Sequence, residues 1–321
     1  MLSSSFSVIL STYSRVLCKR KGIFVENSTI YTMGTYRKKL QGTAQYISFI
    51  PAPLSTVQME EELLTPFVTE AQEAIDQLNQ TLCGLNEEEV ENVLRKEAEA
   101  SWMLSAGKYF FPFGIPSFTS QWNEEEQEEI RHLTEASTYA LESLKTLPLC
   151  GRLLKNAHYL MCQSTLYEKK YPGEFRNSPV WIGPEGCNLK NALFVPPTEE
   201  DMTEAFSELE KFIHEKSDLH ILIRAALIHY QFEAIHPFID ANGRTGRLLH
   251  LLFLFDHKVI REPAFIFSYT LGKYALRYYT ELQKVHESGA YESWVIFFLQ
   301  TLKEAAQQTT RFLSTPPPSF G

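Results

Sequence analysis

Apolar side chains recur every three or four residues through most of this 321-residue chain, and that period is typical of helices buried on one face. In residues 59–82, for example, Leu64, Ala71 and Ile75 fall on one stripe. Two acidic runs, at 86–91 and 123–129, open with asparagine, an order that favours a helix N-terminus. The pattern predicts a mainly α fold. The expected helices span 59–82, 87–104, 124–162 with a break near Pro148, 199–216, 219–234, 243–258, 269–288 and 291–313.

One segment interrupts the helical pattern. Residues 171–197 are rich in proline and glycine and contain the short β-like runs PVWIG (179–183) and ALFV (192–195). Such runs between turn-forming residues predict a β-hairpin inside the helical chain. Residues 46–54 are expected to be extended, because residues before proline avoid the α region.

The first 45 residues differ in charge from the rest. They carry seven basic side chains and one acid, a net charge of +6, whereas the remainder is at −15 and the whole chain at −9. The segment lacks the cleavage pattern of a secretory signal, so we expect a disordered basic leader over 1–45, with Met33 as an alternative start. The acidic body argues against a nucleic-acid partner.

Composition also restricts the environment of the protein. Five cysteines without paired spacing are expected to be reduced thiols. The longest apolar stretch, 219–235, is interrupted by polar residues, so no membrane span is expected. Nine histidines without an HExxH or Cys/His cluster argue against zinc. We expect a cytoplasmic protein, with a secreted effector as the alternative.

Residues 236–247, HPFIDANGRTGR, carry the candidate chemistry. Pro237 ends the incoming helix, and Asn242-Gly243 start a turn whose N–H groups open the next helix, which makes an anion site. Arg244 and Arg247 lie one turn apart and would reinforce that site for a polyphosphate.

Two further side chains complete this segment. Asp240 is placed to hold Mg²⁺ between phosphates, and His236 is placed to take a proton from a hydroxyl. A lone histidine after an apolar helix is usually a core or capping residue, but the combination of specified residues in twelve positions argues for a site. These parts are what nucleotidyl transfer from a nucleoside triphosphate requires.

The segment resembles the signature of the Fic family, H-x-F-x-(D/E)-G-N-G-R-x-x-R, most members of which transfer AMP from ATP to a protein hydroxyl. The resemblance extends to PGEFR (172–176), to the VWIG and FVPP ends of the hairpin, to AALIHYQFEAIHPF (225–238), and to FIPAPL and KEAEAS within residues 46–104. It implies a Fic-type helical bundle with a small β-hairpin flap, preceded by a helical N-terminal domain. The implied units are a leader at 1–45, the N-terminal domain at 46–120, the catalytic domain at 121–313 and a tail at 314–321.

The resemblance also implies roles. His236 would deprotonate the target hydroxyl, Asp240 would hold Mg²⁺, and Phe238 would be buried support. Tyr278 lies where the family has its adenine pocket, an ordinary core tyrosine being the alternative. The implied nucleotide-binding residues are Asp240, Ala241, Asn242, Gly243, Arg244, Thr245, Gly246, Arg247 and Tyr278. The implied target-docking flap edge is Asn191, Ala192, Leu193 and Phe194, which would pair with the target through its backbone.

Two positions depart from the family pattern. Ala241 stands where the family has glycine, and its methyl group is harmless only if its φ is negative. Ser105 stands where many members carry an inhibitory glutamate in the pattern (S/T)-x-x-x-E-(G/N), here begun by Ser101. A hydroxyl cannot form a bidentate ion pair with Arg247, so we expect this helix to inhibit weakly or not at all.

The resemblance therefore implies a protein adenylyltransferase that acts on a Ser, Thr or Tyr hydroxyl, with ATP as co-substrate, Mg²⁺ as cofactor and a protein, itself included, as substrate. The alternatives are the same fold with another nucleotide or a phosphocholine donor, and a nucleotide-binding regulatory protein that has lost catalysis. The oligomeric state, a homodimer included, is left open.

Overall fold

The computed structural model describes residues 33–42, 44–108, 122–164, 167, 170–184 and 186–314. The expectations for 1–32 and for all but the first residue of the tail lie outside these residues, and the domain boundaries stay predictions. The described chain is mostly helical, as expected. Its helices are η1 (Leu54–Thr56), α2 (Glu61–Leu82), α3 (Glu87–Ser105), α4 (Glu124–Ser143), α5 (Gly151–Met161), α6 (Glu199–His214), α7 (Ile221–Ile235), α8 (Asn242–Asp256), α9 (Ser268–Lys273), α10 (Ala275–Ser288) and α11 (Tyr291–Ser314).

The two acidic runs do begin helices. The side chain of Asn86 accepts a bond from the N–H of Glu89, whose carboxylate accepts one from the N–H of Asn86. Asn123 and Glu126 form the same reciprocal pair at the start of α4. Each capping box satisfies two N–H groups that have no partner inside the helix, which explains why α3 and α4 begin at these residues.

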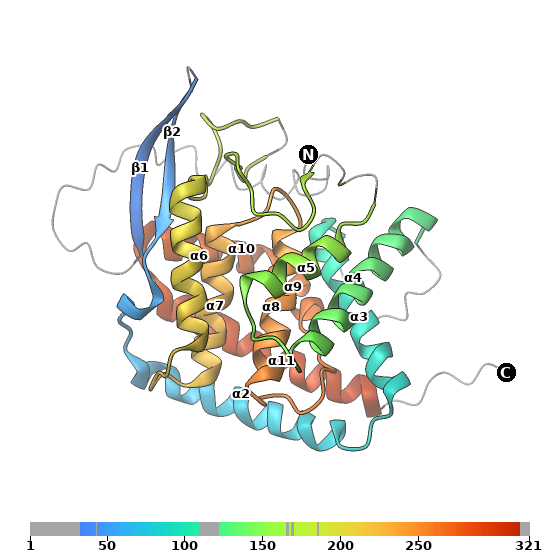
Figure 1. Ribbon diagram of the computed structural model, residues 1–321. Helices are drawn as coiled ribbons and strands as arrows, with labels where there is room; N and C mark the ends of the chain where they lie inside the picture. The colour runs from blue at the N-terminus through green and yellow to red at the C-terminus, as the bar shows by residue number, and fades with distance from the viewer. Residues whose placement is uncertain are drawn as a thin grey trace.

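Helices α7 and α8 form the centre of the molecule. Nearly all their residues are buried, in contrast to the single buried stripes of α2 and α6. The long helices α2 and α11 pack side by side beneath them, and α3, α4 and α5 lie beside α8 (Figure 1). The α7–α8 connection, which carries the HPFIDANGRTGR segment, is therefore held by elements on several sides.

A two-stranded sheet precedes the helices. Strands β1 (Gly34–Gln41) and β2 (Ala44–Pro51) are antiparallel and register Tyr36 opposite Phe49. The expectation of a disordered leader is wrong for this part of residues 1–45. The basic run that suggested a solvated segment has an acidic partner, because Arg37 and Lys39 both bond the carboxylate of Asp201 on α6 at 2.8 and 2.9 Å.

The predicted hairpin at 171–197 is reduced to one β-bridge, between Ile182 and Phe194. Pro179 and Pro184 flank this arm, and proline has no N–H group to donate to a ladder. The flap is instead attached to the sheet, since the N–H of Phe49 donates to the carbonyl of Val195 at 2.9 Å and the Ser48 hydroxyl donates to that of Pro196 at 2.9 Å. The sheet of β1 and β2 rises beside α6 in Figure 1.

The described residues bear on two expectations, the absence of a membrane span and the reduced state of the cysteines. Within them, no helix is long and apolar enough to cross a membrane. The four cysteines that fall within them, Cys83, Cys150, Cys162 and Cys187, are free thiols.

Candidate active site

His236 is the residue that ends α7. It adopts the left-handed conformation at φ 50°, and its N–H donates to the carbonyl of Phe232 at 2.9 Å. Its Nδ1 lies 3.3 Å from the carbonyl of Glu233, a contact that requires the proton to be on Nδ1. Burial, assisted by the nearby charge of Arg176, lowers the pKa of His236 to about 4. At neutral pH the imidazole is thus uncharged and its Nε2 carries a lone pair, the form that a general base requires.

Asn242 closes the loop after His236. Its side-chain oxygen accepts from the N–H of Phe238 at 2.8 Å, and its amide group donates to the carbonyl of the same residue at 2.9 Å. Phe238 is fully buried, as expected, and stacks on the His158 ring with centroids 3.8 Å apart. The Thr245 hydroxyl donates to the carbonyl of Ala241 at 2.9 Å. Asn242 and Thr245 are therefore buried braces of the loop.

Ala241 is the residue that precedes α8. Its φ is 58° and its ψ is 15°, so the condition under which an alanine would be harmless here is not met. A left-handed conformation costs a residue with a Cβ about 1–2 kcal/mol relative to its ordinary conformations. The departure from the family pattern at this position therefore introduces backbone strain into the loop.

Asp240 is surrounded by positive charge. Its Oδ2 forms an ion pair with Lys170 at 2.5 Å, and its Oδ1 accepts from the N–H of Ala241 and lies 3.9 Å from Arg244. Burial works against the charged form, but Arg244 and Lys170 outweigh it and hold the pKa of Asp240 below its usual value. Asp240 is therefore ionised at neutral pH.

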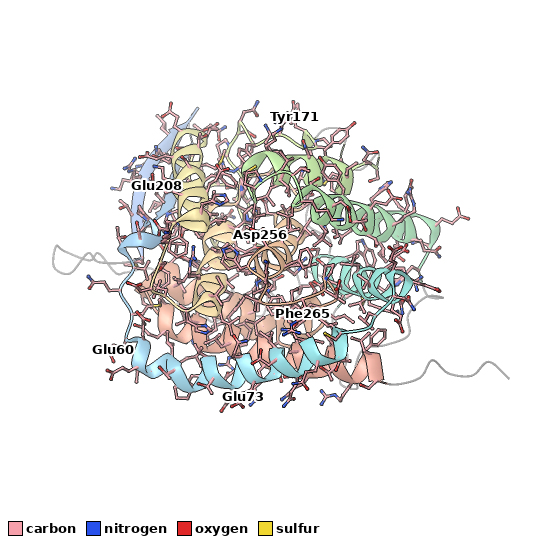
Figure 2. The ribbon with its side chains drawn as sticks, turned by 60° about the horizontal axis from the view of Figure 1, so that its bottom comes forward. Glu60, Glu73, Tyr171, Glu208, Asp256 and Phe265 are labelled. Atoms are coloured by element: carbon pink, nitrogen blue, oxygen red, sulfur yellow. The ribbon has the colours of Figure 1, made fainter. Side chains whose placement is uncertain are left out.

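Arg244 is also paired inside the chain. Its Nη2 donates to the hydroxyl of Tyr167 at 2.6 Å, and Nη1 lies 3.8 Å from the carboxylate of Glu129 on α4. Lys170 lies over the Tyr167 ring, 4.8 Å from its centroid. Lys170 and Tyr167 belong to the segment after α5. Figure 2 shows the position of this segment, because the adjacent Tyr171 is labelled there at the edge of the molecule opposite Glu73 of α2. Lys170 and Arg244 thus both lie beside Asp240, and Tyr167 contacts both of these cations.

Arg247 contacts α3. Its Nε donates to the Ser101 hydroxyl at 2.8 Å, and its Nη2 donates to the Ser101 carbonyl at 2.8 Å and the Ser105 hydroxyl at 2.7 Å. A Cβ at Gly243 would lie 3.0 Å from Nη1 of this guanidinium, so the glycine leaves room for it. The structure brings Ser101 and Ser105 to Arg247, as the resemblance implied, but through uncharged acceptors.

Two buried acids lie near the same guanidinium. Glu97 on α3 accepts bonds from the N–H and the hydroxyl of Ser268. Burial raises the pKa of Glu97 and of Glu233 to about 7, while the charge of Arg247 acts in the opposite direction on both. Near neutral pH each acid is therefore partly protonated.

The remaining predicted residues lie away from the loop. Gly246 faces α7, where a Cβ would be 2.5 Å from the carboxylate of Glu233. Tyr278 is 1% exposed, and its hydroxyl lies 2.9 Å from Nε2 of His229, which favours the core alternative over a pocket lining.

The predicted docking edge is largely engaged within the flap. The N–H groups of Leu193 and Phe194 donate to the carbonyl of Ile182 at 2.9 and 3.1 Å. The side-chain oxygen of Asn191 accepts a bond from the N–H of Asn188 and so closes a turn. Ala192 connects this turn to Leu193. Docking of a target on the unused side of this segment stays a prediction.

Sequence reasoning gave no role to three side chains that support the site. They are Lys170, Arg176 and His158, whose Nδ1 accepts from the N–H of Gly173 at 2.9 Å and whose Nε2 lies 3.1 Å from the carbonyl of Asp240. Arg176 is part of the PGEFR run, which gave a signal by resemblance alone. Lys170 and His158 belong to no motif in the sequence.

The fold and the site together define the class of this protein. It is a helical bundle in which a histidine ends one buried helix, α7, and the next helix, α8, carries Arg244 and Arg247 in its first turns. The sequence model of the Fic/DOC family matches residues 151–254, which include that whole arrangement. The chain contains a domain of the Fic/DOC family.

Relatives with curated names support this assignment over a short region. The chain is 40% identical over 79 residues to "Protein adenylyltransferase Fic" of Drosophila yakuba and 38% identical over 79 residues to the protein of that name from Drosophila melanogaster. Each match covers 24% of this chain and 14% of the relative, so the chain matches about a seventh of the length of these relatives.

Solved structures share the fold over a larger part of the chain. A Fic family protein from Desulfovibrio desulfuricans superposes with a TM-score of 0.64 at 20% identity, covering 81% of this chain and 78% of that one. Fic-1 from C. elegans superposes with a TM-score of 0.51 at 16% identity, covering 78% of this chain and 72% of that one. At these identities the likeness concerns the fold.

Proposed function

We propose that this protein is a protein adenylyltransferase, which transfers AMP from ATP to a hydroxyl of a protein substrate. The observation that carries the proposal is the uncharged imidazole of His236, with Nδ1 bonded to the Glu233 carbonyl, in the short loop that leads into the helix carrying Arg244 and Arg247. The names of the relatives that match this region point to the same activity.

In the proposed reaction, Nε2 of His236 accepts the proton of the target hydroxyl. The hydroxyl oxygen forms a bond to the α-phosphorus of ATP, the bond from that phosphorus to the bridging oxygen breaks, and pyrophosphate leaves. The N–H groups at the start of α8 and the guanidinium of Arg244 would hold the α- and β-phosphates, and Arg247 would hold the γ-phosphate. For this, Arg247 exchanges its hydroxyl partners on α3 for phosphate oxygens.

One side chain of the site, that of Asp240, is a suitable ligand for Mg²⁺. The described residues contain no cluster of three or more side chains that would hold a metal ion. Mg²⁺ nevertheless binds commonly through one or two carboxylates together with substrate phosphates, and Asp240 provides such a carboxylate once Lys170 releases its Oδ2. Bound there, the ion would neutralise charge that develops on the phosphates.

The test is incubation of the purified protein with Mg²⁺ and ATP labelled on the α-phosphate, alone and with cell lysate. ATP labelled on the γ-phosphate serves as a parallel donor, since transfer of AMP moves the α-label only. His236→Ala removes the proposed base. His257→Ala is the matched control, because His257 is exposed and lies at the far end of α8.

Label on protein from the α-position only, lost in His236→Ala and kept in His257→Ala, is the expected result. Absence of label, with ATP binding intact by calorimetry, would contradict the proposal. That result would favour another donor or a nucleotide-binding protein without transfer activity, for which the internal pairing of Asp240, Arg244 and Arg247 is the supporting observation.

A further inference from the structure

Arg176 joins the catalytic loop to both ends of the flap. Its Nε donates to the carbonyl of His236 at 2.8 Å, and its Nη2 donates to the carbonyls of Pro197 at 2.6 Å and Ile235 at 3.3 Å. Its Nη1 donates to the carbonyl of Ser178 at 3.4 Å. Its backbone N–H donates to the carbonyl of Pro237 at 2.9 Å, so the residue is bonded on both sides of the histidine.

The acceptors of this guanidinium are all backbone carbonyls. Arg176 is 3% exposed, and among the described residues it forms no ion pair within 4 Å. The last carbonyls of a helix have no partner within it, and at the end of α7 Arg176 supplies that partner for Ile235. A planar fork of donors suits several acceptors at fixed angles, which a lysine cannot reproduce.

The conformation of His236 makes these bonds consequential. A residue with a side chain at φ 50° is strained, and such a conformation persists only where its surroundings fix it. Arg176 binds the carbonyl of that residue and of its neighbour, and it binds the segments that enter and leave the flap. One buried side chain, bonded only to backbone carbonyls, therefore links the position of the imidazole to that of the flap.

We propose that Arg176 is a positioning residue that holds His236 in its left-handed conformation and in register with the flap, where a target hydroxyl would dock. The proposal rests on the proposed function for its consequence in catalysis, but its structural part concerns the imidazole of the nucleotide-free protein. Two charges act on that imidazole, Arg176, which lowers its pKa, and Asp240, which raises it.

The chain contains a matched control for this arrangement. Arg224 is also buried, at 6% exposure, and its Nη2 donates to the carbonyls of Phe212 at 2.7 Å and Ile213 at 3.3 Å, at the end of α6. It also reaches the carbonyl of Glu215 at 3.1 Å. Arg224 makes no described bond to residues 236–247, so its loss removes the same kind of contact without touching the site.

The experiment compares Arg176→Gln and Arg176→Lys with Arg224→Gln in the full chain. Thermal unfolding reports stability, and NMR titration follows the imidazole of His236, assigned by its absence in His236→Ala. Steady-state label transfer separates kcat from the KM for ATP. Both glutamine variants are expected to lower Tm.

Of the two glutamine variants, only Arg176→Gln is expected to move the His236 titration toward higher pH. It should also lower kcat by about 10- to 100-fold, the effect of a misplaced reacting group, and leave the KM for ATP within about threefold of the wild-type value. Arg176→Lys retains the charge but not the fork. It is expected to leave the titration near that of the wild type while kcat still falls, and it serves as the folded comparison if Arg176→Gln does not fold.

A titration and a kcat that respond no more to Arg176→Gln than to Arg224→Gln would overturn the proposal and leave Arg176 with a structural role only. If the wild-type protein transfers no label, the proposed function fails. The titration of His236 in the two glutamine variants still decides whether Arg176 positions the imidazole.

Discussion

At the scale of single residues, Ala241 occupies a conformation that glycine adopts without strain. Its left-handed φ of 58° places the N–H groups at the start of α8, and its carbonyl accepts from Thr245. His236, five residues earlier, is left-handed as well at φ 50°. The loop between them is therefore held in shape against local backbone preference by the bonds of Asn242, Thr245 and Arg176.

Ala241→Gly is expected to stabilise the protein. Relief of the left-handed conformation contributes about 1–2 kcal/mol, and the greater freedom of glycine in the unfolded chain offsets about 0.4–1 kcal/mol. The midpoints of these ranges give a net gain of about 0.8 kcal/mol, which would appear as a higher urea midpoint. Ala100→Gly, within α3, is the control and should lose about 0.5–1 kcal/mol. A loss of similar size in both variants would show that position 241 is not strained.

At the scale of elements, α3 supplies the partners of Arg247. Two serine hydroxyls and one carbonyl hold a guanidinium that is 3% exposed, and Glu97 on the same helix lies close by. Bonds from arginine to neutral acceptors are weaker than bidentate pairs with a carboxylate. Helix α3 therefore contacts Arg247 closely while leaving it exchangeable.

Ser105→Glu is expected to lower the rate of label transfer by about tenfold or more, because a carboxylate at this position would form a charge-assisted pair with Arg247 and compete with the γ-phosphate. Ser105→Gln has the same shape without the charge and should reduce the rate much less. Initial rates at saturating target, with ATP affinity by calorimetry, distinguish the two. Equal rates for Ser105→Glu and the wild type would contradict this assignment of α3.

The helices were predictable from sequence because their signals are local. The expected helix at 87–104 is α3 at Glu87–Ser105, and its capping box lies within four residues. The candidate site segment was predictable for the same reason, since His236 and Arg247 belong to one short motif. Strand β1 was not, because Tyr36 and Arg37 bond residues 250 and 164 positions away. Lys170 and Arg176 were assigned no role because their partners lie on other segments.

At the scale of the whole molecule, buried titratable groups determine how stability depends on pH. Burial lowers the pKa of four histidines to about 3 or 4 from 6.5, and raises that of two glutamates from 4.5 to about 7. These groups are His158, His229, His236 and His286, and Glu97 and Glu233. Between pH 6.5 and 4.5 these histidines are protonated in the unfolded chain but not in the native state. The two glutamates, in contrast, are protonated in the native state but ionised in the unfolded chain.

The histidines outnumber the glutamates, so the unfolded state binds more protons and the free energy of unfolding is expected to fall as pH is lowered from about 6.5 to 4.5. Urea unfolding at four pH values across this range measures the slope. His286→Phe, whose ring would lie between Phe49 and Phe194, should reduce it. His257→Gln changes an exposed histidine and should not. A free energy of unfolding that stays constant or rises toward acid would contradict this account.

The attachment of the hairpin also orders events during synthesis. Strands β1 and β2 leave the ribosome first among the described elements, yet their partners Val195, Asp201 and His286 are made much later. A two-stranded hairpin alone is marginally stable in water. The hairpin of β1 and β2 therefore lacks its stabilising contacts until α6 and α10 have emerged. Assembly of the flap against β2 becomes a late step, so the face that carries the candidate site is completed only after most of the chain has left the ribosome.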